Sequence, residues 1–285
     1  MQSAMSYAVQ EIARVDGPGA VTAGNHEEVA DYIDQHGLID LDAVPHDDPA
    51  TFSLIQSTRT LGCFQIESPG QRELVGKFAP ETFHDLIIDI SLFRPGPVKS
   101  DMVTPFLRAR QHWVEPEYLH AALREVLEDT CGVVVFHEQV LKIVSIVTGC
   151  TLEDADEFRR AMGVPAMQEK NENWFRSHAA RPRNDAGERV FDDADVNRIW
   201  AVLKAFASFG FCKAHAAAFA LPTYQSAWLK AHHPAAFLAG VLTHDPGMYP
   251  KRLILDDARN FGIAVLPLDV NHSDGKYRVE RLEPR

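Results

Sequence analysis

The stretch from residue 209 to 237 constrains the fold most, because its alanine-rich sequence FGFCKAHAAAFALPTYQSAWLKAHHPAAF strongly favours a helix. Lys213 and His215 lie where this helix should begin. A cationic pair beside small side chains can hold a phosphate while a nucleobase approaches closely, so the stretch indicates nucleotide handling. Pro222 lies inside the run, and we expect it to kink or split the helix near Ala218 because proline removes one helical hydrogen bond.

Apolar periodicity and helix-ending residues recur along the rest of the chain. They predict further helices at about 4–15, 26–36, 49–57, 80–93, 137–149, 151–163, 196–207, 224–232, 235–243 and 250–261. Short apolar runs favour strands at 61–66, 132–136, 263–268 and 277–279. The sequence therefore predicts a mainly α fold with a few short β-strands.

Composition limits the class of protein. With 285 residues, 46% of them hydrophobic, the chain can bury one large core or two modest ones. It has neither an apolar run of membrane-spanning length nor the pattern of a signal peptide, so we expect a cytoplasmic protein without a membrane partner. The cysteines form no C-x-x-C pair, which favours reduced thiols over a zinc site or disulfides.

For nucleic-acid binding, the distribution of charge along the chain matters more than the net charge. A net charge of -12 argues against indiscriminate binding of nucleic acid. Residues 94–110 and 159–183 are nevertheless locally rich in basic side chains. The sequence is thus compatible with a basic groove on an acidic body.

Four motifs precede the 209–237 stretch in a fixed order. They are TLGCFQIES at 60–68, LFRPGP at 92–97, HEQV at 137–140 and EFRRAMG at 157–163. With them the chain closely resembles the bacterial C-family DNA polymerases, meaning the DNA polymerase III alpha subunit and its error-prone paralogues, from about residue 5 to 279. The resemblance implies a fingers domain at 1–245, with an exposed loop or weak boundary near 182–195, and the start of a downstream helical, tandem helix-hairpin-helix region at 246–285.

Two adjacent arginines give the EFRRAMG motif its chemistry. Arg159 and Arg160 on one helical turn can each donate paired hydrogen bonds to successive phosphate oxygens. From the residues alone, a solvated helix face with Asp156 and Glu157 as partners explains them as well. The resemblance implies that both arginines bind the triphosphate of an incoming nucleotide.

Lys213 and His215 open the same two interpretations. The lysine can extend to solvent and the histidine can be a packing residue, or both can face one anion at a loop-to-helix junction. The resemblance implies the second role. The family usually has an Asn and a Tyr where this chain has Cys212 and Phe219, so the resemblance does not carry over the contacts to the nucleotide sugar or base that depend on those polar groups.

The resemblance extends to other side chains. It implies that Arg94, at a rigid Pro-Gly-Pro turn, is a further triphosphate ligand. Gln65 and Glu67 look like hydrogen-bonding residues that organise the side facing the palm. The candidates for DNA-backbone contacts, each equally explained as a solvated surface residue, are Lys99, Arg108 and Arg110.

Carboxylates that could hold catalytic metal ions are not apparent. Transfer of a nucleotidyl group by two metal ions needs clustered carboxylates. Asp40 and Asp42 lie in a polar turn, and His232, His233 and His244 have no matching carboxylate pattern. We therefore predict neither a catalytic nor a metal-binding residue in this chain. The resemblance implies that Mg²⁺ is bound by palm carboxylates outside it.

The function that the resemblance implies is part of a DNA-directed DNA polymerase, a nucleotidyltransferase of replication or of error-prone lesion-bypass repair. Its partners would be a dNTP, primer-template DNA, the palm and thumb of the same polymerase, a sliding clamp and replisome or lesion-bypass proteins. The isolated chain is expected to be inactive. The alternatives are a non-catalytic scaffold derived from a truncated paralogue and, with less support, a helical nucleotide hydrolase.

Overall fold

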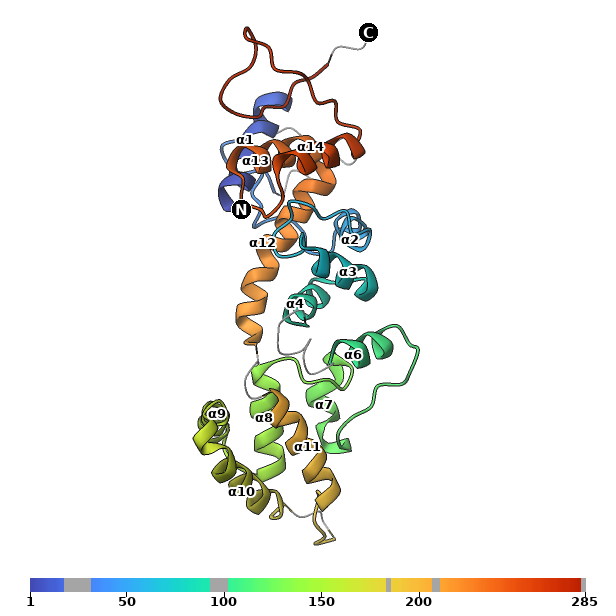
Figure 1. Ribbon diagram of the computed structural model, residues 1–285, viewed down its shortest axis with the longest axis vertical. Coiled ribbons are helices and arrows are strands. Elements are labelled where there is room, and N and C mark those ends of the chain that lie inside the picture. Colours follow the sequence, from blue (N-terminus) through green and yellow to red (C-terminus); the bar gives the residue numbers. More distant parts are fainter. Residues whose placement is uncertain (18–31, 93–101, 183–185, 207–210, 283–285) are drawn as a thin grey trace. The chain divides into compact units, whose positions relative to one another are not determined.

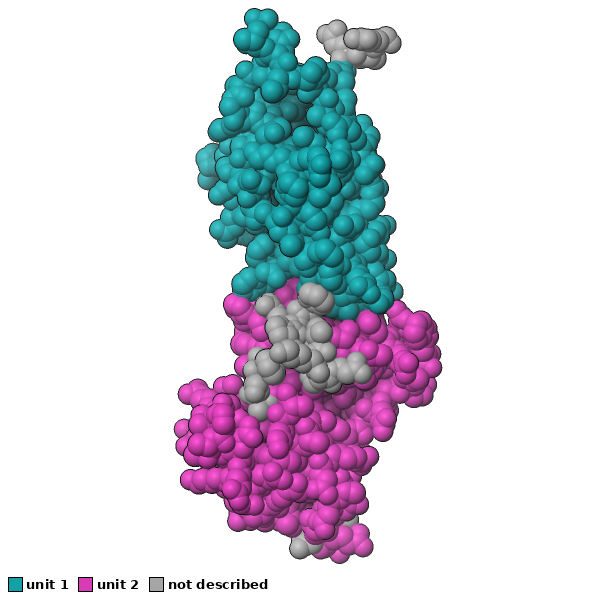
Figure 2. All heavy atoms as spheres, in the orientation of Figure 1, with its two compact units in different colours: residues 1–86, 218–285 teal, residues 87–217 magenta. Residues whose placement is uncertain are grey.

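The computed structural model describes residues 1–17, 32–92, 102–182, 186–206 and 211–282, which form a mainly helical fold (Figure 1). The chain divides into two compact units (Figure 2). Unit 1 consists of residues 1–86 and 218–285, and unit 2 of residues 87–217. The helices α4 (Phe83–Leu92) and α12 (Lys213–His232) each have residues in both units.

Unit 1 is built around the close packing of α1 (Gln2–Asp16) on α13 (Pro234–His244). Besides these and its parts of α4 and α12, the described helices of this unit are α2 (Pro49–Gln56), α3 (Pro69–Phe78) and α14 (Lys251–Asn260). Gly240 is required where α1 meets α13, because a Cβ atom at this position would overlap the backbone oxygen of Ala4.

Unit 2 is a set of helices around an aromatic core. They are α6 (Val103–Arg110), α7 (Arg124–Leu127), α8 (His137–Thr148), α9 (Leu152–Met162), α10 (Gln168–Ala179) and α11 (Asp193–Phe206). Both α9 and α10 pack against α8. Phe158 and Trp200 each contact Phe175, which is fully buried. The apolar stripe expected along 196–207 forms the buried face of α11.

α12 runs unbroken through Pro222, so the proline does not split the helix, while the kink expected near Ala218 stays a prediction. Proline removes one backbone donor, at a cost of about 3 kcal/mol. Tertiary packing offsets this cost, because Ala220, Tyr224 and Leu229 on either side of the proline are fully buried.

The predicted strands at 61–66, 132–136, 263–268 and 277–279 are wrong. The described residues form only isolated bridges, between Ile33 and Ile39 and between Phe136 and Phe211. Apolar burial without strand pairing explains the first two segments. The 61–66 segment is a series of turns, in which Gly62 has a φ of 80°.

The helix expected at 26–36 lies partly outside the described residues, and its described end is a turn. The Asp34 carboxylate accepts the backbone N–H groups of His36 and Leu38 at 2.8 and 2.9 Å. Gly37 there has a φ of 75°. Local side-chain bonds of this kind favour a turn over a helix.

A buried ammonium group joins three parts of unit 1. Lys230 on α12 donates to the backbone oxygen of Leu61 at 2.6 Å and to the carboxylate of Asp257 on α14 at 2.7 Å. The Lys230 side chain is 0% exposed and lies 5.0 Å from the centre of the Phe261 ring. Cys63 in the same turn is also fully buried, and burial raises the pKa of its thiol to about 12.

Substitution of this lysine tests the contribution of the ion pair to stability. We expect Lys230→Met to lower the free energy of unfolding by about 3–5 kcal/mol, because it leaves the buried Asp257 charge without its partner. Urea denaturation of the chain measures this loss. The double variant with Asp257→Leu should regain most of it, since an apolar pair can replace a buried ion pair.

The exposed pair of Lys77 with Glu73 is the matched control for this measurement. Both side chains are more than half exposed, at 58% and 67%. Lys77→Met should therefore change stability by less than about 0.5 kcal/mol. Equal losses in the two lysine variants would contradict the role assigned to Lys230.

Candidate functional site

The two arginines of EFRRAMG lie in the last turn of α9. The helix begins at a capping box in which Thr151 Oγ1 accepts from the Asp154 N–H at 3.1 Å. Phe158 and Met162 turn their side chains into the core of unit 2. Arg160, on the opposite face, is 73% exposed.

Asp156 is the shared partner of both arginines. It accepts from Arg159 at 2.9 Å and from Arg160 at 2.7 Å. The hydrogen bond from Arg159 is the main cause that lowers the pKa of Asp156. The pairing expected of a solvated helix face is thus present, and the Arg160 side chain remains largely exposed beside its partner.

Lys213 lies in the first turn of α12, where two carboxylates approach it. Both oxygens of Glu138 accept the backbone N–H of Lys213 at 3.1 Å. The ammonium lies 3.7 Å from Asp129 and 5.4 Å from the centre of the Phe136 ring. The protein's own carboxylate therefore occupies the helix N-terminus, a position that attracts anions.

Residues beside the lysine complete this turn. The Cys212 thiol donates to Glu138 at 3.4 Å. His215 is exposed, and its ring meets the edge of Phe211 with 5.2 Å between centres. The structure thus places Lys213 and His215 on one turn and the two arginines on another helix of the same unit.

The HEQV motif holds the segments around Lys213 in place. The Gln139 side-chain oxygen accepts the N–H groups of Val135 and Phe136 at 2.8 and 3.0 Å, which explains why this buried run does not need a strand partner. The Gln139 amide donates to Thr130 Oγ1 at 2.7 Å. The backbone N–H of His137 donates to Phe211 at 2.9 Å.

Sequence reasoning missed this role of Glu138 and Gln139. Their motif supported the resemblance, but no function was assigned to either residue. Glu138 and Lys213 are 75 residues apart in sequence, so no local pattern shows that they meet. Asp129 was missed for the same reason.

Four predicted site residues remain, and the structure describes two of them. Arg94 and Lys99 lie outside the described residues. The DNA-contact candidates Arg108 and Arg110 are in the last turn of α6 in unit 2.

The CFQIES segment belongs to unit 1, where Glu67 does act as a hydrogen-bonding residue. It accepts from the N–H groups of Gly62 and Met248 at 3.2 and 3.0 Å. Phe219, which stands at the position of the implied Tyr, stacks on Phe64 with 5.7 Å between ring centres.

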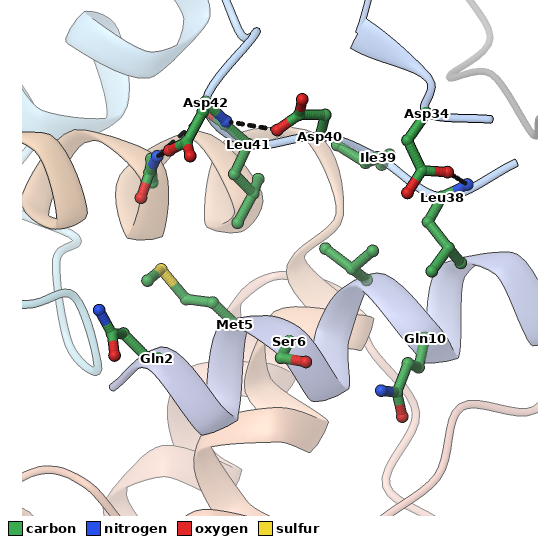
Figure 3. A pocket seen from close by; sticks show the side chains of 12 residues that line it. Gln2, Met5, Ser6, Gln10, Asp34, Leu38, Ile39, Asp40, Leu41 and Asp42 are labelled. Atoms are coloured by element: carbon green, nitrogen blue, oxygen red, sulfur yellow. Dashed lines mark hydrogen bonds between the residues drawn. The ribbon is translucent and has the colours of Figure 1, made fainter. Parts of the chain in front are cut away.

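A shallow groove of about 500 Å³ lies in unit 1, between residues of α1 and of the 34–42 turn. Figure 3 shows side chains of α1 on one side and the 34–42 turn on the other. Asp40 accepts the Asp42 N–H at 3.0 Å, and Asp42 accepts from Gln225 at 2.8 Å, so these acids stabilise the turn. Among the described residues that line the groove none is basic, and such a lining is unsuited to a triphosphate.

The described part of the chain contains no group of three or more His, Cys, Asp or Glu side chains placed to hold a metal ion. None of its helices combines the length and the apolar character that crossing a bilayer requires.

Comparisons with known proteins agree with the sequence motifs. The profile of the family described as the bacterial DNA polymerase III alpha subunit finger domain matches residues 26–182. An error-prone DNA polymerase of Symbiobacterium thermophilum is 40% identical over 253 residues, covering 88% of this chain and 23% of that protein. One from Methylococcus capsulatus is 37% identical over 246 residues, covering 84% and 23%. The chain therefore spans less than a quarter of the length of these relatives.

Removing the Glu138 carboxylate tests whether it holds the start of α12. We expect Glu138→Ala to speed amide hydrogen exchange in the first turn of α12 about fivefold or more, because the Lys213 N–H loses a charged acceptor worth about 1 kcal/mol. Glu125→Ala, at an exposed site in the same unit, is the control. Unchanged exchange at residues 213–216 would contradict the capping role.

Asp89 on α4 gives a test based on pH. The side chain is fully buried, neither oxygen has a hydrogen-bond partner among the described residues, and burial raises its pKa well above the usual value. A raised folded-state pKa means that the wild type loses stability as pH rises above the ordinary carboxyl range.

Asp89→Asn cannot ionise. Its stability relative to the wild type should therefore increase from about pH 4 to about pH 8, by about 1–3 kcal/mol. Urea denaturation at both pH values measures this difference. A difference that stays constant or shrinks with rising pH would show that the carboxyl group is not held neutral.

Proposed function

Because this chain belongs to the family of bacterial DNA polymerase III alpha subunit finger domains, we propose that it holds the incoming dNTP and the primer-template of a DNA-directed DNA polymerase. The names of the relatives favour the error-prone type, which acts in lesion bypass and repair. Under this proposal the bond-forming step takes place on palm carboxylates with Mg²⁺, outside these residues. The chain alone is then inactive in synthesis.

The observation that carries the proposal is the pairing of two guanidiniums with one carboxylate on the exposed turn of α9. Arg160 is largely exposed and shares Asp156 with Arg159. A triphosphate offers several charged oxygens where Asp156 offers two, so it can compete for these donors. The arginines would then neutralise the charge on the transferred phosphates without taking part in bond making.

Lys213, His215 and Arg94 complete the proposed triphosphate ligands. The Lys213 ammonium is only loosely paired, at 3.7 Å from the exposed Asp129, so little free energy is needed to release it. Lys99, Arg108 and Arg110 are the proposed contacts to the DNA backbone. Each of these would position the duplex without reading its sequence.

The wider assignment follows from the family and forms part of the same proposal. Residues 1–245 would be the fingers domain, and residues 246–285 the start of the downstream region. The palm and thumb would be partners within the polymerase. A sliding clamp and lesion-bypass or replisome proteins would be external partners in the bacterial cytoplasm.

One observation favours the scaffold alternative. Arg159, Arg160 and Lys213 all have carboxylates of the chain beside them. If these pairs persist in the polymerase, the cations serve the fold and do not bind nucleotide. The experiment below separates the two functions.

Substitution at Arg160 in the polymerase tests the assignment. We expect Arg160→Ala to lower kcat/KM for dNTP incorporation about 10- to 100-fold, because it removes a charge-assisted hydrogen bond worth about 1.5–3 kcal/mol. Arg176→Ala is the matched control, since Arg176 pairs with Glu172 four residues earlier on α10 of the same unit. Primer-extension kinetics at varied dNTP concentration give both values.

Removal of the carboxylate that pairs with the arginines can be tested on this chain alone. Asp156→Asn removes the internal competitor of Arg159 and Arg160, and it should tighten dNTP binding about threefold or more in titration calorimetry. Equal kcat/KM for the two arginine variants, with no change in dNTP affinity for Asp156→Asn, would favour the scaffold.

A further inference from the structure

Trp113 is a large apolar side chain left in water. It is 72% exposed, whereas Trp200 and Trp228 are 5% and 3% exposed. Trp174 packs on Phe158 with 5.1 Å between ring centres. The chain has four tryptophans, so Trp113 is the one whose ring has little contact with the protein.

The backbone that carries Trp113 is held in a defined turn. α6 is anchored by the buried residues Phe106 and Ala109. Beyond it the chain turns at His112, which has a φ of 57°. The N–H groups of Trp113 and Val114 then donate to the backbone oxygen of Arg108 at 2.9 and 3.4 Å. The indole is thus presented from a fixed turn, which lowers the entropy cost of binding a ligand on it.

The segment from α6 to Val114 is basic. Residues 103–114 contain Arg108, Arg110 and His112 and no acidic residue, in a chain whose net charge is -12. Arg108 is exposed. Acidic residues follow directly after this segment, at Glu115 and Glu117, so the basic side chains are confined to α6 and its turn. An exposed aromatic ring beside basic side chains matches the chemistry of a single nucleic-acid strand, whose bases stack while its phosphates follow the positive charge.

We propose that Trp113 is a stacking platform for an unpaired base of single-stranded DNA, with the strand's phosphates against Arg108 and Arg110. The inference rests on the proposed function, which supplies the DNA. It adds a residue that recognises whether a base is unpaired. A base in a duplex stacks on its own neighbours and has no free face for the indole. The site therefore prefers an unpaired template segment to duplex DNA.

The experiment uses the 285-residue chain and a labelled oligothymidylate. Binding should quench the tryptophan fluorescence of the wild type, and fluorescence anisotropy should show that Trp113→Leu weakens affinity about fivefold or more. Trp113→Phe, which keeps an aromatic face, should retain most of the affinity. Arg108→Gln should reduce the dependence of affinity on salt.

Two controls make the result specific. Met248→Ala removes a side chain that is 64% exposed in unit 1, and it should not change affinity. A blunt duplex of equal length should bind the wild type and Trp113→Leu equally. Wild-type affinity in Trp113→Leu, binding without quenching, or no binding of the oligonucleotide would each overturn the inference and leave a protein partner as the explanation of this exposed ring.

The same samples separate this inference from the proposed function. Binding of free dNTP should respond to Asp156→Asn and should not respond to Trp113→Leu. If the dNTP result holds and the oligonucleotide result fails, only the stacking role is wrong. If the reverse occurs, the chain binds a single strand while its triphosphate site is misassigned.

Discussion

The rest of the structure depends on two carboxylates that accept hydrogen bonds from α12, one near each end of the helix. In unit 2, Glu138 accepts the N–H of Lys213 at the start of the helix. In unit 1, Asp257 accepts from Lys230 near its end. Loss of the cap would cost about 1 kcal/mol and an unpaired buried ammonium about 3–5 kcal/mol, and the second is a large share of the net stability of a domain.

Carboxylates of the chain lie beside three of the proposed phosphate ligands in unit 2, Arg159, Arg160 and Lys213. Asp156 serves two arginines and Asp129 lies beside Lys213. Such pairs are weak in water because solvent and salt screen them. A ligand with one negative charge gains little by displacing them, whereas a polyphosphate can engage several cations together. Internal pairing therefore favours multivalent anions, and it fits a chain whose net charge is negative.

Local patterns in the sequence predicted much of the helical fold. The capping box at Thr151 and the left-handed Gly149 set the boundary between α8 and α9 where expected. Strand predictions failed where buried apolar runs obtain their hydrogen bonds from side chains, as Val135 does from Gln139. Pro222 showed the limit of local propensity, because packing on both sides keeps the helix continuous.

The candidate site was predictable only in part, for a physical reason. The Asp156 partner lies within one helical turn of the arginines, so spacing alone suggested it. Glu138 reaches Lys213 across 75 residues, and such contacts arise from the fold. The exposure of Trp113 was equally invisible, since the sequence shows an aromatic residue without showing which face of the protein it occupies.

The depth of Cys63 in the turn before Glu67 has a chemical consequence. A thiol must lose its proton to react, and burial raises the pKa of the Cys63 thiol to about 12, so it stays protonated throughout the physiological range. Alkylating reagents and oxidants can then modify it only when the turn opens. The rate at which Cys63 is modified, followed by mass spectrometry, would therefore report how often this part of unit 1 opens.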